Sequence, residues 1–152
     1  MRRDVWARAA GLALPVNQVI SHLWSRPRPY AAHSAVTVIA DRSTDPSFPS
    51  DHAAAAFAIA YAIGAFSATV GALFLSGATI VALSRVAGGL HYPSDVVAGF
   101  LVGLFAAALV VTVGREPVER VVALLARVAD PVLGPVRRPI EAAIRRRRRR
   151  RA

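Results

Sequence analysis

The chain has 152 residues, contains no cysteine and carries a formal net charge of +10. This length fits a single domain, and the lack of cysteine excludes disulfides, iron–sulfur clusters and thiolate zinc sites. Hydrophobic residues make up 55% of the chain and charged residues only 18%, which is below the roughly one quarter typical of soluble domains. The composition therefore favours a membrane protein.

The first apolar stretch, residues 5–24, predicts a helix that lies in the membrane and is partly shielded by its neighbours. It contains Arg8, Pro15, Asn17 and Gln18, which makes it the weakest of the candidate crossings.

No charged residue occurs between positions 53 and 83. As one helix, this stretch would be about 46 Å long, whereas the hydrocarbon core of a bilayer is about 30 Å thick. We therefore expect the chain to fold back at Ser67–Gly71, where small and β-branched residues weaken a helix. This predicts one crossing at residues 52–67 and another at 70–86, and a last apolar stretch predicts a crossing at 94–113.

These stretches predict an all-α fold, a polytopic transmembrane helical bundle with about four crossings. Residues 1–114 would form the transmembrane domain and residues 115–134 an interfacial helix. Arginines near both ends of the chain favour a cytoplasmic location for both termini. The loop at 25–51 and the segment at 85–94 would then lie together on the extracytoplasmic face.

The remaining residues, 135–152, are rich in proline and arginine and end in the uninterrupted run Arg145–Arg151. Like charges repel within such a run, so we expect a disordered basic tail. Contact with anionic lipids is expected, at about 1 kcal/mol per arginine. Nonspecific binding of nucleic acid is the alternative, and no specific nucleic acid partner is expected.

The most specific polar cluster is Ser-Arg85-x5-His91-x3-Asp95. The Pro-Ser pair before Asp95 indicates a helix start, which places His91 at the membrane edge. The Asp95 carboxylate can accept a hydrogen bond from one imidazole nitrogen and leave the other free to attack phosphorus. An interfacial histidine followed by a helix-capping aspartate is the alternative. Arg85 favours the catalytic interpretation, because a charge at the end of a crossing is costly without a partner.

A second cluster, Pro49-Ser50-Asp51-His52, opens the crossing expected at 52–67. The free N–H groups and the dipole of a helix start attract anions, and the Ser50 hydroxyl adds a donor. His52 is then placed to protonate a leaving oxygen and to activate water afterwards. An ordinary Ser/Asp helix cap explains the same residues, so this assignment depends on the other clusters.

The third cluster, Arg26-Pro27-Arg28-Pro29, closes the first expected helix. Its prolines stop the helix, and its two guanidinium groups can each bind phosphate oxygens through paired hydrogen bonds. Contact with lipid headgroups is the alternative, above all for Arg26. Together the three clusters supply the cations, the nucleophile and the acid that phosphoryl transfer requires.

In this order the clusters resemble the type 2 phosphatidic acid phosphatase superfamily, whose signature is Lys-x6-Arg-Pro, Pro-Ser-Gly-His and Ser-Arg-x5-His-x3-Asp. The resemblance covers about residues 17–103 and implies that His91 is the nucleophile that forms a phosphohistidine, Asp95 its orienting carboxylate and His52 the general acid. It implies no metal and no other cofactor. The implied phosphate-binding residues are Arg28, Ser50 and Arg85, with the backbone of Asp51 and the side chain of Arg26 as further candidates.

The chain departs from this signature at two positions. Ser21 stands where the signature has lysine, and Arg26 is a candidate substitute for that cation. Asp51 replaces the glycine of the second motif, so its carboxylate has to point away from the phosphate or be neutralised. The family core has six crossings, so with four expected here the two N-terminal helices are expected to be absent.

The Arg-Pro-Arg-Pro and Phe-Pro-Ser-Asp-His segments look closest to the bacitracin-resistance-type undecaprenyl pyrophosphate phosphatases. This resemblance implies hydrolysis of undecaprenyl pyrophosphate to undecaprenyl phosphate at the extracytoplasmic face of the cell membrane, which recycles the cell-wall carrier. Phosphatidic acid and phosphatidylglycerophosphate are alternative substrates. A vanadium haloperoxidase shares the oxyanion site, but those relatives are soluble. A truncated, weakly active or inactive homologue that acts through its tail is the non-enzyme alternative.

Overall fold

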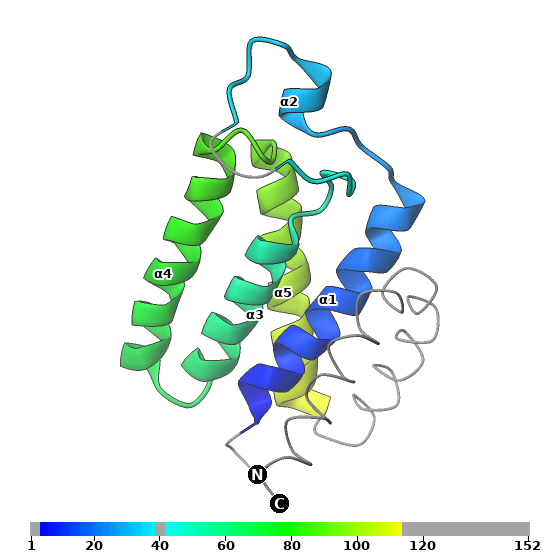
Figure 1. The fold of residues 1–152 in the computed structure, drawn as a ribbon. Coiled ribbons are helices and arrows are strands. Elements are labelled where there is room, and N and C mark those ends of the chain that lie inside the picture. The colour runs from blue at the N-terminus through cyan, green and yellow to red at the C-terminus, as the bar shows by residue number, and fades with distance from the viewer. Residues whose placement is uncertain (1–3, 39–41, 114–152) are drawn as a thin grey trace, which may run out of the picture.

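The computed structural model describes residues 4–38 and 42–113, and it contains helices and no strand within those ranges. The helices are α1 (Val5–Leu23), α2 (Pro29–Ala32), α3 (Asp51–Gly64), α4 (Ala68–Ala87) and α5 (Pro93–Val113). Figure 1 shows α1, α3, α4 and α5 as one bundle, with α2 and its loops beyond one end. The expected all-α class is confirmed for these residues. The expected interfacial helix and basic tail lie outside them.

The expected fold-back between two apolar helices is confirmed, but it lies before the expected Ser67–Gly71, because residues 68–71 already belong to α4. α3 ends at Gly64 and α4 begins at Ala68, so the chain turns within residues 65–67. Ser67 has an extended backbone, and its side chain accepts a hydrogen bond from the N–H of Val70 at 3.5 Å. This is the usual role of serine at a helix N-terminus, where the first N–H groups have no partner within the helix.

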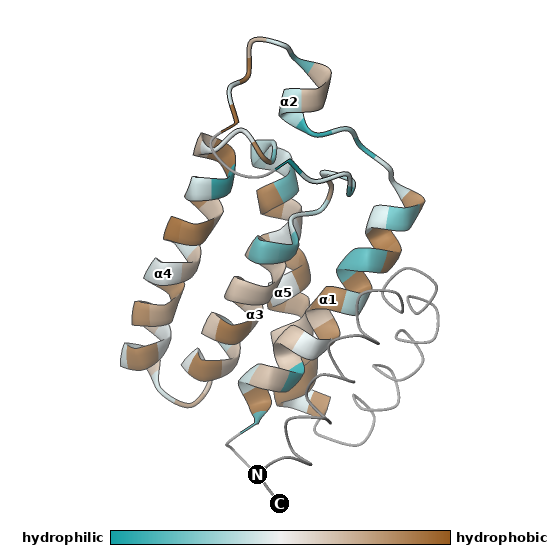
Figure 2. Cartoon of the chain, in the orientation of Figure 1, coloured by the Kyte–Doolittle hydropathy of each residue, from teal (hydrophilic) through white to brown (hydrophobic). Residues whose placement is uncertain are grey.

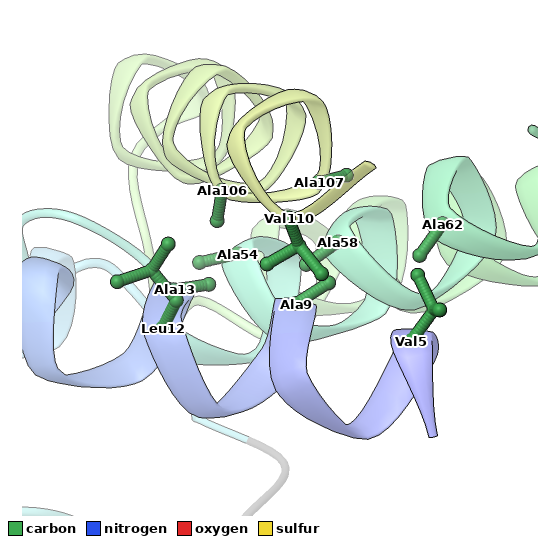
Figure 3. Packing of buried hydrophobic residues seen from close by; sticks show 10 residues of the cluster. All are labelled: Val5, Ala9, Leu12, Ala13, Ala54, Ala58, Ala62, Ala106, Ala107 and Val110. Carbon is green, nitrogen blue, oxygen red and sulfur yellow. The ribbon is translucent and has the colours of Figure 1, made fainter. Parts of the chain in front are cut away.

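α3 occupies the middle of the bundle and packs against α1, α4 and α5 (Figure 1). The main core lies between α1, α3 and α5, and Figure 3 shows its small side chains pointing toward one another. Most of its residues are alanines, which lets the helix backbones approach closely. The core comprises Val5, Ala9, Leu12, Ala13, Ala54, Ala58, Ala62, Ala106, Ala107 and Val110.

Two glycines of α5 bring its backbone directly against α3. A Cβ atom at Gly99 would lie 2.6 Å from the carbonyl oxygen of Ser50, and one at Gly103 would lie 2.5 Å from that of Ala54. Any larger residue would therefore push the two helices apart. This contact fixes the start of α3 against the first turns of α5.

Two of the described helices, α4 and α5, are long and apolar enough to cross a membrane. α1 includes polar residues, and the 14 residues of α3 reach only about 21 Å, so neither matches the length and composition of a typical crossing. Large apolar side chains stay exposed along α4 and α5, including Leu73 (70% exposed) and Phe105 (61%), and Figure 2 shows apolar residues along both helices. Such faces suit lipid contact. The total of four crossings remains a prediction.

Candidate active site

The three polar clusters meet at one end of the bundle, around a cavity of about 360 Å³. The C-terminal ends of α1 and α4, the start of α3 and the loops before α2, α3 and α5 all contribute to it. Figure 2 shows hydrophilic residues gathered at this end. The cavity is lined by Arg28, His52, Arg85 and His91 from the clusters, and also by Gln18, Ser21, His22, Ser43, Asp45, Pro46, Pro49, Asp51 and Leu90.

His91 reaches the cavity from a short turn between α4 and α5. Gly89 has a φ of +69°, a left-handed conformation that glycine adopts without strain, and it lets the chain reverse after α4. The N–H groups of Leu90 and His91 then donate to the carbonyl oxygen of Arg85 at 3.1 and 3.2 Å. The turn therefore holds His91 against the end of α4.

The two ring nitrogens of His91 have partners of opposite kinds. Nδ1 lies 2.7 Å from the carbonyl oxygen of Ser47, and Nε2 lies 3.3 Å from an Nη atom of Arg28. A carbonyl oxygen only accepts hydrogen bonds and a guanidinium only donates them. These contacts therefore require a proton on Nδ1 and leave a lone pair on Nε2, at the side of the ring that faces Arg28.

The surroundings of His91 favour its neutral form. The side chain is 5% exposed, and burial lowers its pKa from 6.5 to about 4. The hydrogen bond to Ser47 opposes this effect, and the nearby Arg28 charge adds to it. The imidazole is therefore uncharged at neutral pH, as a nucleophile has to be.

Asp95 is fully buried, but its carboxylate does not make the expected hydrogen bond to His91. Its Oδ2 lies 3.8 Å from Nδ1 of His91, and it accepts instead from the hydroxyl of Ser47 and from the N–H of Tyr92 at 2.9 Å. The Nδ1 proton is already directed at the Ser47 carbonyl. In this structure Ser47 therefore links the histidine to the carboxylate.

Arg26 contacts residues at the start of α5 and is not part of the cavity lining. Its Nη1 donates to Oδ1 of Asp95 at 3.0 Å and to the Ser94 hydroxyl at 2.8 Å, and its guanidinium carbon lies 3.8 Å from the centre of the Tyr92 ring. Arg26 does not line the cavity. It neutralises the buried carboxylate of Asp95, so a direct phosphate contact by Arg26 has no support in this geometry.

Arg28 and Arg85 do line the cavity, and their surroundings differ. Arg28 is held by the carbonyl oxygens of Asp45 and Leu90, at 3.0 and 3.3 Å. The Nε atom of Arg85 is buried and has no hydrogen-bond partner in the described part of the chain. Arg85 therefore brings to the cavity a cation with at least one donor that no protein group in this part of the chain satisfies.

Of the second cluster, His52 and Asp51 line the cavity and Ser50 does not. His52 is exposed and lines the cavity, as a general acid has to. Ser50 is fully buried and does not line the cavity, so the expected phosphate contact of its hydroxyl has no support in this geometry, and its N–H donates to the carbonyl oxygen of Asp95 at 3.0 Å. The Asp51 carboxylate lines the cavity and accepts hydrogen bonds from the side chains of Asn17 and Gln18.

Sequence reasoning did not assign Ser47, Asn17 or Gln18 to the site. The only signal for the two amides was their polarity within an apolar stretch, and Ser47 gave none. Within the described ranges, no group of three or more His, Asp or Glu side chains is arranged to hold a metal ion.

The family model for the PAP2 superfamily matches residues 6–118. The bacitracin transport permease protein BcrC of Bacillus licheniformis is 37% identical over 95 residues, 62% of this chain and 47% of that protein. The undecaprenyl-diphosphatase BcrC of Bacillus subtilis (strain 168) is 34% identical over 101 residues, 66% of this chain and 52% of that protein. The decaprenylphosphoryl-5-phosphoribose phosphatase of Mycobacterium tuberculosis (strain ATCC 25618 / H37Rv) is 38% identical over 116 residues, 74% of this chain and 63% of that protein.

The chain spans about half the length of the two Bacillus relatives. No solved structure matches it. The family model covers most of the chain and includes all three polar clusters, so the family expected from the motifs is confirmed. This chain belongs to the PAP2 superfamily.

Proposed function

We propose that this protein hydrolyses a lipid phosphate or pyrophosphate through a phosphohistidine intermediate, without a metal, at the extracytoplasmic face of the membrane. The observation that carries the proposal is the state of His91. Its Nε2 atom has a lone pair and faces a cation, and its neutral form is favoured by burial. His52, Arg28 and Arg85 line the same cavity.

In the first step, Nε2 of His91 attacks phosphorus while the bond from phosphorus to the leaving oxygen breaks. His52 gives its proton to that oxygen, and Arg28 and Arg85 balance the charge on the other phosphate oxygens. The proton stays on Nδ1, hydrogen-bonded to the Ser47 carbonyl oxygen, and this contact stabilises the positive ring that forms. In the second step, His52 takes a proton from water, the water oxygen attacks phosphorus and the nitrogen–phosphorus bond breaks. Inorganic phosphate leaves, and His91 is again neutral.

The first candidate substrate is undecaprenyl pyrophosphate, which would yield undecaprenyl phosphate. The name of the Bacillus subtilis relative supports this choice. The exposed apolar faces of α4 and α5 support a substrate that is delivered from the membrane.

The second candidate is a phosphorylated sugar carried on a polyprenyl lipid, and the lining of the cavity favours it. Asp45 is exposed and lines the cavity, and Ser21 occupies the position of the signature lysine. Carboxylates accept hydrogen bonds from hydroxyl groups but repel a second phosphate. The name of the Mycobacterium tuberculosis relative supports such a substrate.

Phosphate release in detergent, with a chelator present, tests the reaction and ranks the substrates. The panel should contain undecaprenyl pyrophosphate, a polyprenyl phosphosugar, phosphatidic acid and phosphatidylglycerophosphate. We expect turnover of at least one polyprenyl lipid by the native protein and none by the His91→Ala variant. Activity that requires added divalent metal, or that survives in His91→Ala, would contradict the mechanism.

The sidedness can be tested with single cysteines, because the chain contains none. Ala32 is in α2, at the end of the bundle that holds the cavity, and Ala68 begins α4 at the opposite end (Figure 1). Both positions are exposed, so each can be replaced by cysteine and labelled. In intact cells, a maleimide that does not cross the membrane should label Ala32→Cys and spare Ala68→Cys. The reverse pattern would place the site in the cytoplasm.

A further inference from the structure

Asp51 places a carboxylate in a cavity that would bind an anion. It lines the cavity together with Arg28 and Arg85. A carboxylate without partners would repel phosphate oxygens and would compete with them for both guanidinium groups. No arginine forms an ion pair with Asp51 in the described part of the chain. Its charge must therefore be satisfied in another way.

Two consecutive residues of α1 satisfy that charge. Asn17 Nδ2 donates to Oδ1 of Asp51, and Gln18 Nε2 donates to Oδ2 at 2.7 Å. Both carboxylate oxygens therefore accept hydrogen bonds from neutral amides. Hydrogen bonds to a carboxylate stabilise it and hold it in one orientation.

Asn17 also holds the chain that leads into α3. It is completely buried, and the same Nδ2 atom donates to the carbonyl oxygen of Pro49 at 3.1 Å. An apolar side chain would be the usual occupant of such a position between packed helices. The amide group is therefore best explained by its donors, which reach the backbone before Asp51 as well as its carboxylate.

We propose that Asn17 and Gln18 are positioning residues that hold the Asp51 carboxylate against α1. In this arrangement Arg28 and Arg85 stay available to the substrate, and His52 keeps its place in the first turn of α3. The proposal rests on the proposed function, because it concerns how an anionic substrate is admitted to the same cavity. It also explains how the chain accommodates aspartate where the signature has glycine.

A double-mutant cycle tests this coupling. Asn17→Leu and Gln18→Leu are combined in the native background and in the Asp51→Gly background, and kcat and KM are measured for the best lipid of the panel. We expect the Leu pair to raise KM by about tenfold or more in the native background, where it frees the carboxylate, and by less than about threefold beside Asp51→Gly. An equal rise in both backgrounds, or no rise in either, would overturn the proposal.

Two further variants separate positioning from stability. Gln18→Lys keeps a donor for Asp51 and adds a cation to the cavity lining, so its KM should not rise above the native value, in contrast to that of the Leu pair. Leu12→Ala removes a buried side chain of α1 that does not line the cavity, so it should lower the melting temperature and leave KM unchanged. A rise in KM in Leu12→Ala equal to that of the Leu pair would mean that general loosening of α1 explains the effect.

Binding of inorganic phosphate gives a readout that does not need turnover. Protection by phosphate against thermal unfolding yields a dissociation constant for every variant of the cycle. We expect the Leu pair to weaken binding only where Asp51 is present, and equal weakening in both backgrounds would overturn the proposal. Phosphate binding by a native protein that hydrolyses no lipid would contradict the proposed function and leave the coupling to be judged by binding.

Discussion

The carbonyl oxygen of Ser47, and not the carboxylate of Asp95, lies within hydrogen-bonding distance of Nδ1 of His91. The Ser47 hydroxyl donates to that carboxylate, so one residue contacts both groups. A backbone carbonyl fixes the tautomer of an imidazole as a carboxylate would, but it carries no full charge. Asp95 therefore acts on His91 in two ways, through its charge at 3.8 Å and through its hydrogen bond to Ser47.

The Ser47→Ala variant should separate these two contacts. It keeps the carbonyl that holds Nδ1 and removes the hydroxyl that binds Asp95. We expect kcat to fall by roughly 3–10-fold with little change in KM, because a positioning hydrogen bond is lost and no substrate contact is removed. Steady-state phosphate release checks this. A KM effect larger than the kcat effect would instead indicate that Ser47 contacts the substrate.

The depressed pKa of His91 should make the folded protein sensitive to acid. Between about pH 6.5 and pH 4 the unfolded chain binds a proton on His91 that the folded chain does not, so the free energy of unfolding falls as pH falls through this window. A shift of the pKa from 6.5 to about 4 lowers the free energy of unfolding by at most about 3 kcal/mol over this window.

Thermal unfolding in detergent from pH 7 to pH 4 measures this effect. The native protein should lose more stability over that range than a His91→Gln variant, which has no proton to gain at this position. Parallel losses in the two proteins would show that His91 is not held neutral by burial.

Removal of Arg26 should mainly lower stability, whereas removal of Arg85 should mainly lower activity. Arg26→Ala leaves the buried carboxylate of Asp95 without its cation, so we expect a loss of stability of about 2–4 kcal/mol, partly restored by adding Asp95→Asn. Arg85→Gln removes a guanidinium whose Nε has no protein partner in the described ranges, so stability should change little while kcat/KM falls about 10²-fold or more. Melting curves and kinetics of both variants decide this, and a large drop in the melting temperature of Arg85→Gln would contradict it.

Gly99→Ala should disturb the site through packing alone. Its new methyl group would lie 2.6 Å from the carbonyl oxygen of Ser50, which forces α5 away from the start of α3. We expect a loss of stability of about 1–3 kcal/mol together with lower activity. Gly77→Ala on α4 is the matched control, because nothing lies within 4 Å of its new methyl group. That change should be neutral or slightly stabilising, and equal melting temperatures for the two variants would argue against the close contact.

The long apolar helices could be predicted from sequence because their signal is local. Runs without charge, together with the small residues at the turn, predict α4 and α5 to within about two residues at each end. α3 is shorter than predicted, since the chain already turns after Gly64. The four-residue α2 was not predicted, because one helical turn leaves no periodic pattern.

The candidate site was predictable where its chemistry depends on side-chain type and spacing, as for His91 and Arg85. It was not predictable where the contact is made by backbone, because every residue has a carbonyl and nothing in the sequence distinguishes that of Ser47. The resemblance implied Arg28 as a phosphate-binding residue and Arg26 only as a further candidate, but nothing in the sequence predicts that Arg26 pairs with Asp95. That pairing depends on the fold, which brings Arg26 to Ser94 and Asp95 in the first turn of α5.

The hydrogen bond between Arg28 and Nε2 of His91 has a consequence for what can react there. In the resting site the lone pair of Nε2 already accepts a hydrogen bond from Arg28. An uncharged electrophile does not compete for that guanidinium, so the hydrogen bond stays in place. An anion does compete, because its oxygens accept hydrogen bonds from Arg28 in place of Nε2. The same exchange frees the lone pair of Nε2 to react. Selection for negative charge would thus precede bond formation, and neutral alkylating reagents should modify this histidine slowly.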